Sequence, residues 1–180
     1  VVGFQHRLGH DPQDEDAEHF GWDEYLLYHA QRGFSFLVDS QEGWSQVKPT
    51  TGAPQLSANG QSASYLGSTF ALEYSYEAET TYVAGEFYWP VARGQKTLNR
   101  DFTKGKSLLS MEQTPAEITW SAGSRIDSNA VVKAFKLEDK KDVLQRDDPG
   151  PFVAKSGLGC GTIIVIAVII LILLIILSDC

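Results

Sequence analysis

The commonest pattern along this chain of 180 residues is an alternation of apolar and polar positions with a period of two. Between residues 33 and 39 (GFSFLVD), Phe34, Phe36 and Val38 fall on one face, and Ser35 falls on the other. Such alternation is typical of a β-strand with one buried face. This segment is therefore predicted to be a strand at the edge of a hydrophobic core.

Further strands are expected on both sides of this segment. Residues 22–29 and 44–49 are separated from it by short polar turns, so the three segments predict an antiparallel meander. The polar residues 50–64, which include glycine, proline and an Asn-Gly pair, predict a loop. Two more strands are predicted after this loop, at 68–78 and at 80–91.

The predicted strand at 68–78 (STFALEYSYEA) has the longest alternation in the chain. It is expected to place one set of apolar side chains on the core and the polar set in water. The apolar set consists of Phe70, Leu72, Tyr74 and Tyr76.

The remaining elements complete a mainly β domain over residues 1–148. Residues 115–126 predict a hairpin that turns at Ala122-Gly123. Residues 128–148 predict the one helix, with Ser128 as its N-cap. The expected fold is a twisted antiparallel sheet that forms a barrel or a sandwich, with one short helix.

The end of the chain has a different pattern, because it is apolar throughout. The 23 residues between Lys155 and Asp179 carry no charge. A helix of this length extends about 34 Å, which is enough to cross the hydrocarbon core of a bilayer. A transmembrane helix is therefore predicted at 159–178, after a linker at 149–158. Its apolar residues include Ile163, Ile169, Leu174 and Leu177.

Charge predicts the orientation of this span. Six basic residues precede it, and only Asp179 follows it; the six are Lys133, Lys136, Lys140, Lys141, Arg146 and Lys155. Positive charge stays on the cytoplasmic side of a membrane, so the β domain is expected to be cytoplasmic. Cys160 and Cys180, the two cysteines of the chain, flank the apolar run, which excludes a disulfide scaffold in the β domain.

The net charge of −8 is unevenly distributed. Residues 1–90 carry 13 acidic and 3 basic residues, whereas residues 91–155 carry 9 acidic and 12 basic residues. The basic half adjoins the predicted span, where an anionic leaflet attracts it. The acidic first half argues against a nucleic-acid partner. The lipid bilayer is thus the first partner that the sequence predicts.

Histidines and carboxylates concentrate in the sequence HRLGHDPQDEDAEH, at residues 6–19. His6, His10 and His19 are candidate metal ligands, since imidazole and carboxylate groups both bind metals. The spacing matches no common metal site, and Gly9 and Pro12 predict a loop. We therefore favour a solvated acidic loop over a metal site.

The sequence GEFYW places Glu86 among aromatic residues, which makes Glu86, Tyr88 and Trp89 a candidate ligand site. A carboxylate in such surroundings would be desolvated and suited to bind a cation. The simpler alternative, which we favour, is an outward glutamate paired with a basic residue. Six further aromatic residues are expected either to line a ligand cleft or, as is more common for aromatic residues on strands, to pack in the core. They are Trp22, Tyr25, Tyr28, Trp44, Tyr74 and Tyr76.

No nucleophile elbow, phosphate-binding loop, dinucleotide fingerprint or HExxH motif occurs in the sequence. The sequence thus gives no support for catalysis, and no cofactor is predicted.

Four segments resemble a bacterial family catalogued as domain of unknown function 4178. They are WDEYLLYHAQRGFSFLV, YLGSTFALEYSYEAE, GEFYW and LSMEQTPAEITWSAGSRI, and the resemblance extends from Gly3 to Phe135. It implies a β-rich bacterial domain of membrane-associated proteins, encoded near small membrane proteins and spermidine-synthase-like enzymes. It implies no catalytic residues. It also implies one further strand before Val1, so the first strand is expected to be an exposed sheet edge.

Together these features predict a binding or scaffolding domain anchored in the bacterial inner membrane. It would hold a protein partner or further copies of itself, with the first strand and the span as assembly surfaces. This role would be linked to membrane stress or polyamines. The alternative is a receptor or enzyme for a polyamine or a divalent cation, which would use the acidic loop or Glu86.

Overall fold

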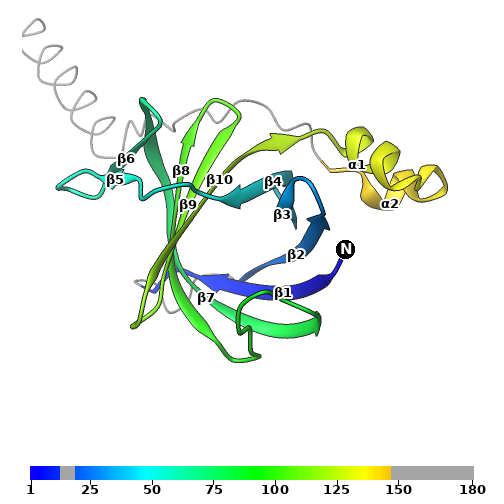
Figure 1. Ribbon diagram of the computed structural model, residues 1–180, viewed down its shortest axis with the longest axis horizontal. Coiled ribbons are helices and arrows are strands. Elements are labelled where there is room, and N and C mark those ends of the chain that lie inside the picture. The colour runs from blue at the N-terminus through cyan, green and yellow to red at the C-terminus, as the bar shows by residue number, and fades with distance from the viewer. Residues whose placement is uncertain (13–18, 147–180) are drawn as a thin grey trace, which may run out of the picture.

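The computed structural model describes residues 1–12 and 19–146, which form a closed antiparallel β-barrel with a short helical segment on its outside (Figure 1). The mainly β prediction is confirmed, and of its two forms the structure has the barrel. The predicted linker at 149–158 and the predicted span at 159–178 lie outside the described residues. Within the described residues, no helix is both long and apolar enough to cross a membrane.

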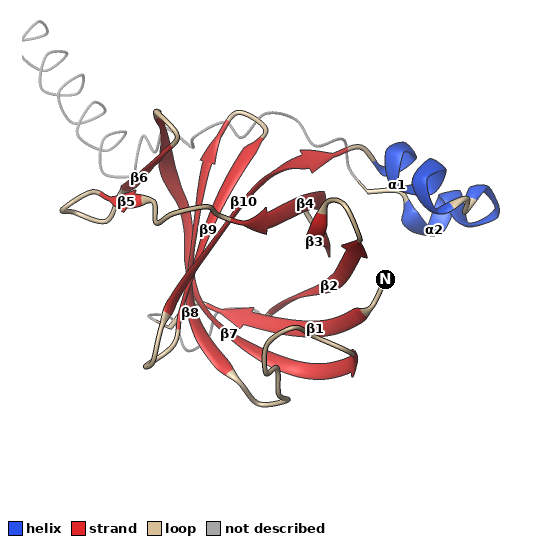
Figure 2. Ribbon diagram, viewed as in Figure 1, coloured by secondary structure: helices blue, strands red, loops and turns tan. Residues whose placement is uncertain are grey.

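Eight strands form the barrel wall, each paired with two neighbours (Figure 2). The order around the wall is β1 (Gly3–His10), β2 (Phe20–His29), β3 (Gly33–Ser40), β4 (Gly43–Pro49), β10 (Ile118–Ile126), β9 (Ser107–Gln113), β8 (Lys96–Lys104) and β7 (Ser68–Gly85). Pairing of β7 with β1 closes the barrel. Two short strands, β5 (Gln55–Leu56) and β6 (Ser62–Tyr65), extend the sheet from the first part of β7.

The closure corrects the expectation of an exposed first edge. β1 pairs with β2 along one side and with β7 along the other. Its backbone groups therefore have partners on both sides, and the barrel removes the edge that an open sheet would leave. β1 also extends to His10, so part of the predicted acidic loop is strand.

The 18 residues of β7 replace the two strands predicted at 68–78 and 80–91. A register shift between Leu72 and Tyr74 leaves Glu73 without a partner on β8, as in a β-bulge. Phe70 and Leu72 pack in an apolar cluster, whereas Tyr74 lines the barrel interior. The single apolar face predicted for this strand is therefore wrong, because the bulge moves the later residues to the opposite face.

Two apolar clusters lie on the outer surface of the wall, since their residues alternate with residues that line the interior. Leu109 and Met111 of β9 belong to the first cluster, while Ser110 and Glu112 between and beside them line the interior. β6 covers this cluster through Ala63. The second cluster joins Leu37 of β3 and Trp44 of β4 to the helical segment through Val131.

The helical segment comprises α1 (Ser128–Phe135), a 3₁₀ turn η1 (Glu138–Lys140) and α2 (Lys141–Leu144). Asp127, one residue before the predicted cap, accepts a hydrogen bond from the backbone N–H of Asn129 at 2.7 Å. Lys136 has φ +56°, a left-handed conformation that ends α1. The single helix predicted over 128–148 is thus divided into short pieces.

Three other expectations are corrected. The segment 50–64, predicted as loop, contains β5 and most of β6. β8 and β9 were not predicted. Residues 115–126 do not form a hairpin, because β10 runs straight through Gly123 and pairs with β4 and β9.

Gly123 permits close contact between β10 and β4. A Cβ atom at this position would overlap the carbonyl oxygen of Gln46. We expect Gly123→Ala to separate β10 from β4 and to lower the free energy of unfolding by more than about 2 kcal/mol. Gly21→Ala is the control, because a Cβ atom at Gly21 would have the His6 and Leu8 side chains as its nearest neighbours, at 3.1 Å or more. This variant should lower the free energy of unfolding by less. Urea denaturation of both variants measures the difference; equal stability would contradict this packing.

Candidate functional site: a polar cavity inside the barrel

A cavity of about 640 Å³ occupies the barrel interior and is lined by every strand of the wall. The alternation of the strands places polar side chains on it. Gln5 and Arg7 come from β1, Glu24 from β2, and Asp101 from β8. Leu109 and Met111 of β9 face an outer cluster instead, whereas Phe20, Trp22, Phe36 and Val47 line the cavity beside the polar groups. The interior is therefore a lined chamber rather than the main hydrophobic core.

Arg7 extends across this chamber and is 3% exposed. Its Nη1 donates to Glu112 on β9 at 2.7 Å and lies 3.5 Å from Glu24 on β2. Its Nη2 donates to the Thr97 hydroxyl on β8. Burial lowers the pKa of Arg7, but Glu112 and Glu24 more than offset this effect and hold it above its ordinary value. Arg7 thus stays charged and links strands on opposite sides of the barrel.

Glu24 is held in place by three donors. Its carboxylate accepts hydrogen bonds from Gln5 Nε2 at 2.7 Å and from the Trp22 indole at 2.6 Å, in addition to Arg7. The Arg7 guanidinium also lies over the Trp22 ring, 5.3 Å from its centre. These contacts fix both the charge and the aromatic ring at one wall of the cavity.

Among the described residues, the hydrogen-bond donors to the Asp101 side chain are neutral. The Tyr76 hydroxyl donates to it at 2.8 Å, and the Ser110 hydroxyl donates to its other oxygen. Burial raises the pKa of Asp101, although both hydroxyls and the positive charge of Arg7 oppose this shift. Burial also raises the pKa of Tyr76, with a further contribution from the charge of Asp101. Asp101 is thus a carboxylate whose ionised form gains stability when a cation approaches.

Glu112 combines a buried setting with access to the cavity. Its side chain keeps 37% of its surface exposed even though it contacts Arg7. Burial raises the pKa of Glu112, while the positive charge of Arg7 lowers it, and the net direction is upward. One carboxylate oxygen binds Arg7 and the open side faces the chamber, so Glu112 can bind a second cation.

A further set of polar groups lies at the end of the cavity next to the turn between β3 and β4. Glu42 in this turn accepts hydrogen bonds from the Tyr74 hydroxyl at 2.6 Å and from Arg125 at 3.0 Å. Both partners also line the cavity. This end is therefore polar and partly balanced in charge.

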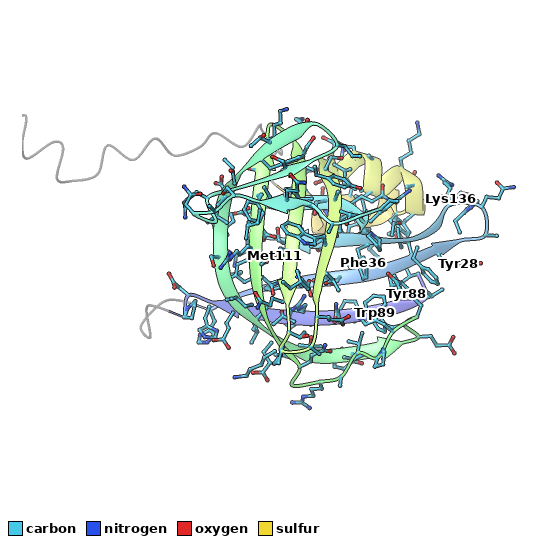
Figure 3. All side chains as sticks on the ribbon, turned by 60° about the vertical axis from the view of Figure 1, so that its left-hand side comes forward. Tyr28, Phe36, Tyr88, Trp89, Met111 and Lys136 are labelled. Carbon is cyan, nitrogen blue, oxygen red and sulfur yellow. The ribbon has the colours of Figure 1, made fainter. Side chains whose placement is uncertain are left out.

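The opposite end is covered by the loop between β7 and β8, residues 86–95. Trp89 of this loop packs edge-on against Phe36 of β3 at 5.5 Å, and Tyr88 lies 4.3 Å from Phe34. Both Tyr88 and Trp89 line the cavity, and Figure 3 shows them beside Phe36. The cavity thus has an aromatic end and a polar end.

The predicted ligand residues are only partly brought together. Tyr88 and Trp89 line the cavity, as do Trp22, Trp44, Tyr74 and Tyr76 of the predicted aromatic set. Glu86 is exposed and absent from the lining. Tyr25 packs in the outer apolar cluster with Trp44. The GEFYW segment therefore contributes its aromatic residues to the site and directs its carboxylate elsewhere.

The predicted metal ligands lie on the outside of the barrel. His6 Nδ1 is 2.7 Å from Asp23, and the rings of His10 and His19 are 5.4 Å apart. The described residues contain no group of three or more His, Cys, Asp or Glu side chains placed to hold a metal ion. Residues 13–18, which supply most of the acidic groups of this segment, lie outside the described residues.

The central charged residues of the cavity, Arg7, Glu24, Asp101 and Glu112, were not predicted as site residues. The sequence did carry one signal. Gln5 and Arg7 alternate with Phe4 and Leu8, so a strand there has a polar face. Only closure of the barrel shows that this polar face points inward.

The fold and the cavity define the class of protein, a closed β-barrel with a charged interior chamber. The family described as domain of unknown function (DUF4178) matches residues 8–128, so the chain belongs to this family, as the resemblance predicted. The matched residues run from β1 to the first residue of α1 and include all the charged residues of the cavity except Arg7. Searches of curated proteins and of solved structures found no match.

Asp101 gives a test of the chamber that needs no ligand. Because its pKa is raised on folding, its ionised form destabilises the barrel. Stability is lost as the pH rises above the unfolded-state pKa, and the loss is complete above the folded-state pKa. We expect Asp101→Asn to stabilise the protein at pH 7, on the order of 1 kcal/mol or a few degrees in Tm.

This gain should disappear below the pKa of an unfolded aspartate, about 3.9, where both forms are neutral. Thermal unfolding monitored by circular dichroism from pH 3.5 to 8 measures the difference in Tm. A difference that does not change with pH would show that burial does not raise the pKa of Asp101.

Proposed function

We propose that the barrel binds a small organic cation in its cavity, and that the chain is tethered to the bacterial inner membrane by residues 159–178. The observation that carries the first part is the charge of the cavity lining. Five carboxylates and two guanidiniums line it: Glu24, Glu42, Asp101, Glu112, Glu117, Arg7 and Arg125. The lining thus carries an excess of negative charge, which favours a cationic ligand.

The other lining residues favour an organic cation over a metal ion. Trp22, Tyr76 and Trp89 offer aromatic faces to the chamber, and ammonium groups bind such faces. The volume of about 640 Å³ is in the usual range for small-molecule sites. Amines with several positive charges, the chemistry of polyamines, fit a chamber with carboxylates near its middle and at both ends.

Arg7 is compatible with this ligand because its charge is already neutralised by Glu24 and Glu112. Its Nε is a buried nitrogen without a hydrogen-bond partner in the described residues. A water molecule bound beside the ligand would complete the hydrogen bonds of this group.

The proposed membrane tether is supported by the sequence of the uncharged run between Lys155 and Asp179. The expected role in assembly with a protein partner or further copies stays a prediction. One of its two surfaces, a free edge on β1, is absent because the barrel is closed. The cavity therefore supports a binding role more directly than a scaffolding role.

Titration calorimetry of the detergent-solubilised full chain with spermidine tests the cation proposal. We expect saturable binding that weakens at high salt. Asp101→Asn and Glu112→Gln should each weaken it at least tenfold, or about 1.4 kcal/mol. Choline, with one charge, should bind more weakly than spermidine.

Glu79→Gln is the matched control. Glu79 lies on β7 opposite Lys96, to which it is paired at 3.8 Å, and it does not line the cavity. Removing its charge should leave the affinity unchanged. If no amine binds, or if this control weakens binding as much as the two cavity variants, the cavity proposal is wrong.

A further inference from the structure

Aromatic side chains gather at one end of the barrel and form a continuous surface there. We define the aromatic end by Tyr28, Phe34, Phe87, Tyr88 and Trp89. The ring centres of Tyr28 and Phe34 are 4.9 Å apart, those of Phe34 and Tyr88 are 4.3 Å apart, and those of Tyr88 and Trp89 are 4.2 Å apart. Figure 3 shows Tyr28, Tyr88 and Trp89 close together at the edge of the molecule.

The aromatic end is partly exposed to solvent. Tyr28 is 55% exposed and Tyr88 is 50% exposed. Contacts between neighbouring rings, including Phe87 and Trp89 at 5.4 Å, connect the five side chains into one patch. A fixed apolar patch on a small domain marks an interaction site. Tyrosine and tryptophan, with an apolar ring and a polar tip, are the residues enriched at the boundary between lipid and water.

Charge differs between the two ends of the barrel. The turns and strand ends around the aromatic end carry Arg32, Lys48 and Arg93 against Glu86 and Glu117. The segment that joins β1 to β2 leaves and re-enters at the opposite end, and its residues 11–19 include five acidic residues and no Lys or Arg. The turn between β8 and β9 at that opposite end carries Lys104 and Lys106, so the two ends differ through the acidic segment. An anionic leaflet would repel this segment and favour contact through the aromatic end.

The chain beyond the barrel keeps the domain near the predicted span. Arg146, the last described residue, is held to Asp39 by two hydrogen bonds of 2.8 and 2.7 Å and lies over the Trp44 ring. Twelve residues separate it from the apolar run that begins at Gly159. Asp39 and Trp44 flank the turn between β3 and β4, at the end of the barrel opposite the aromatic end. Fully extended, the segment reaches about 45 Å. This exceeds the roughly 26 Å length of an eight-residue strand such as β1, so the aromatic end can reach the bilayer.

We infer that the aromatic end docks on an anionic bilayer surface, with Tyr88 and Trp89 among the lipid headgroups. The docking rests on the proposed membrane tether but not on cation binding. It orients the barrel so that the aromatic end of the cavity faces the lipid and the end with Glu42 and Arg125 faces water. A second copy of the chain is the competing occupant of this surface.

Fluorescence quenching in nanodiscs tests the docking. The full chain is placed in nanodiscs that contain phosphatidylglycerol and brominated lipid, whose bromine atoms quench nearby tryptophans. Trp22 and Trp44 are only 8% and 3% exposed, and Trp120 packs against Phe102 on the wall. Trp89 should therefore give most of the quenching, and we expect Trp89→Phe to abolish most of it.

A second variant and a control leave Trp89 in place. Tyr28→Ser with Tyr88→Ser should reduce the quenching. Leu66→Ser should leave it unchanged, since Leu66 is 84% exposed at the turn between β6 and β7, away from the aromatic end. Near-ultraviolet circular dichroism checks that each variant keeps its fold. A chain that enters nanodiscs but shows no Trp89-dependent quenching would overturn the docking alone.

Two further outcomes would also overturn it. If the chain does not enter nanodiscs, the tether is wrong as well as the docking. If sedimentation shows dimers that Tyr28→Ser with Tyr88→Ser dissociates, while the quenching stays absent, the aromatic end binds a second copy instead.

Discussion

The guanidinium of Arg7 reaches from β1 through the barrel interior to Glu112 on β9 and Thr97 on β8, while Glu24 on β2 contacts it from the other side. These contacts require that β1 and β7 pair, because that pairing brings the first strand beside the last part of the sheet. Arg7 is buried, so its charge must keep these carboxylate partners. Closure and the Arg7 contacts therefore depend on each other.

This arrangement divides apolar and polar residues in an unusual way for a small domain. The apolar clusters around Phe102 and around Trp44 lie on the outer wall, covered by β6 and by the helical segment. Much of the apolar packing thus lies outside the wall, while the charged residues lie inside it, beside core residues such as Trp22 and Val47.

The sequence correctly predicted the features of the fold that depend on short stretches of the chain. The β class, the meander of β2, β3 and β4, and the family were all correct, since each depends on short-range alternation or motif. The prediction that Phe70, Leu72, Tyr74 and Tyr76 share one face was wrong. The bulge at Glu73 turns the later residues to the opposite face of the strand, and no local pattern in the sequence marks this bulge. The inward face of Arg7 depends on its contact with Glu112, 105 positions away, which only the closed topology brings together.

Asp101 shows why the chamber is better explained by binding than by folding. A carboxylate among neutral hydroxyls costs stability when ionised, whereas an asparagine could make hydrogen bonds to Tyr76 and Ser110 without that cost. Buried groups that weaken a fold concentrate at functional sites. If the chamber binds a cation, as we propose, the charge of Asp101 that destabilises the empty barrel would attract the ligand and recover part of this cost as affinity. The same residue would then tie stability to occupancy, so the barrel should be most stable when it is filled.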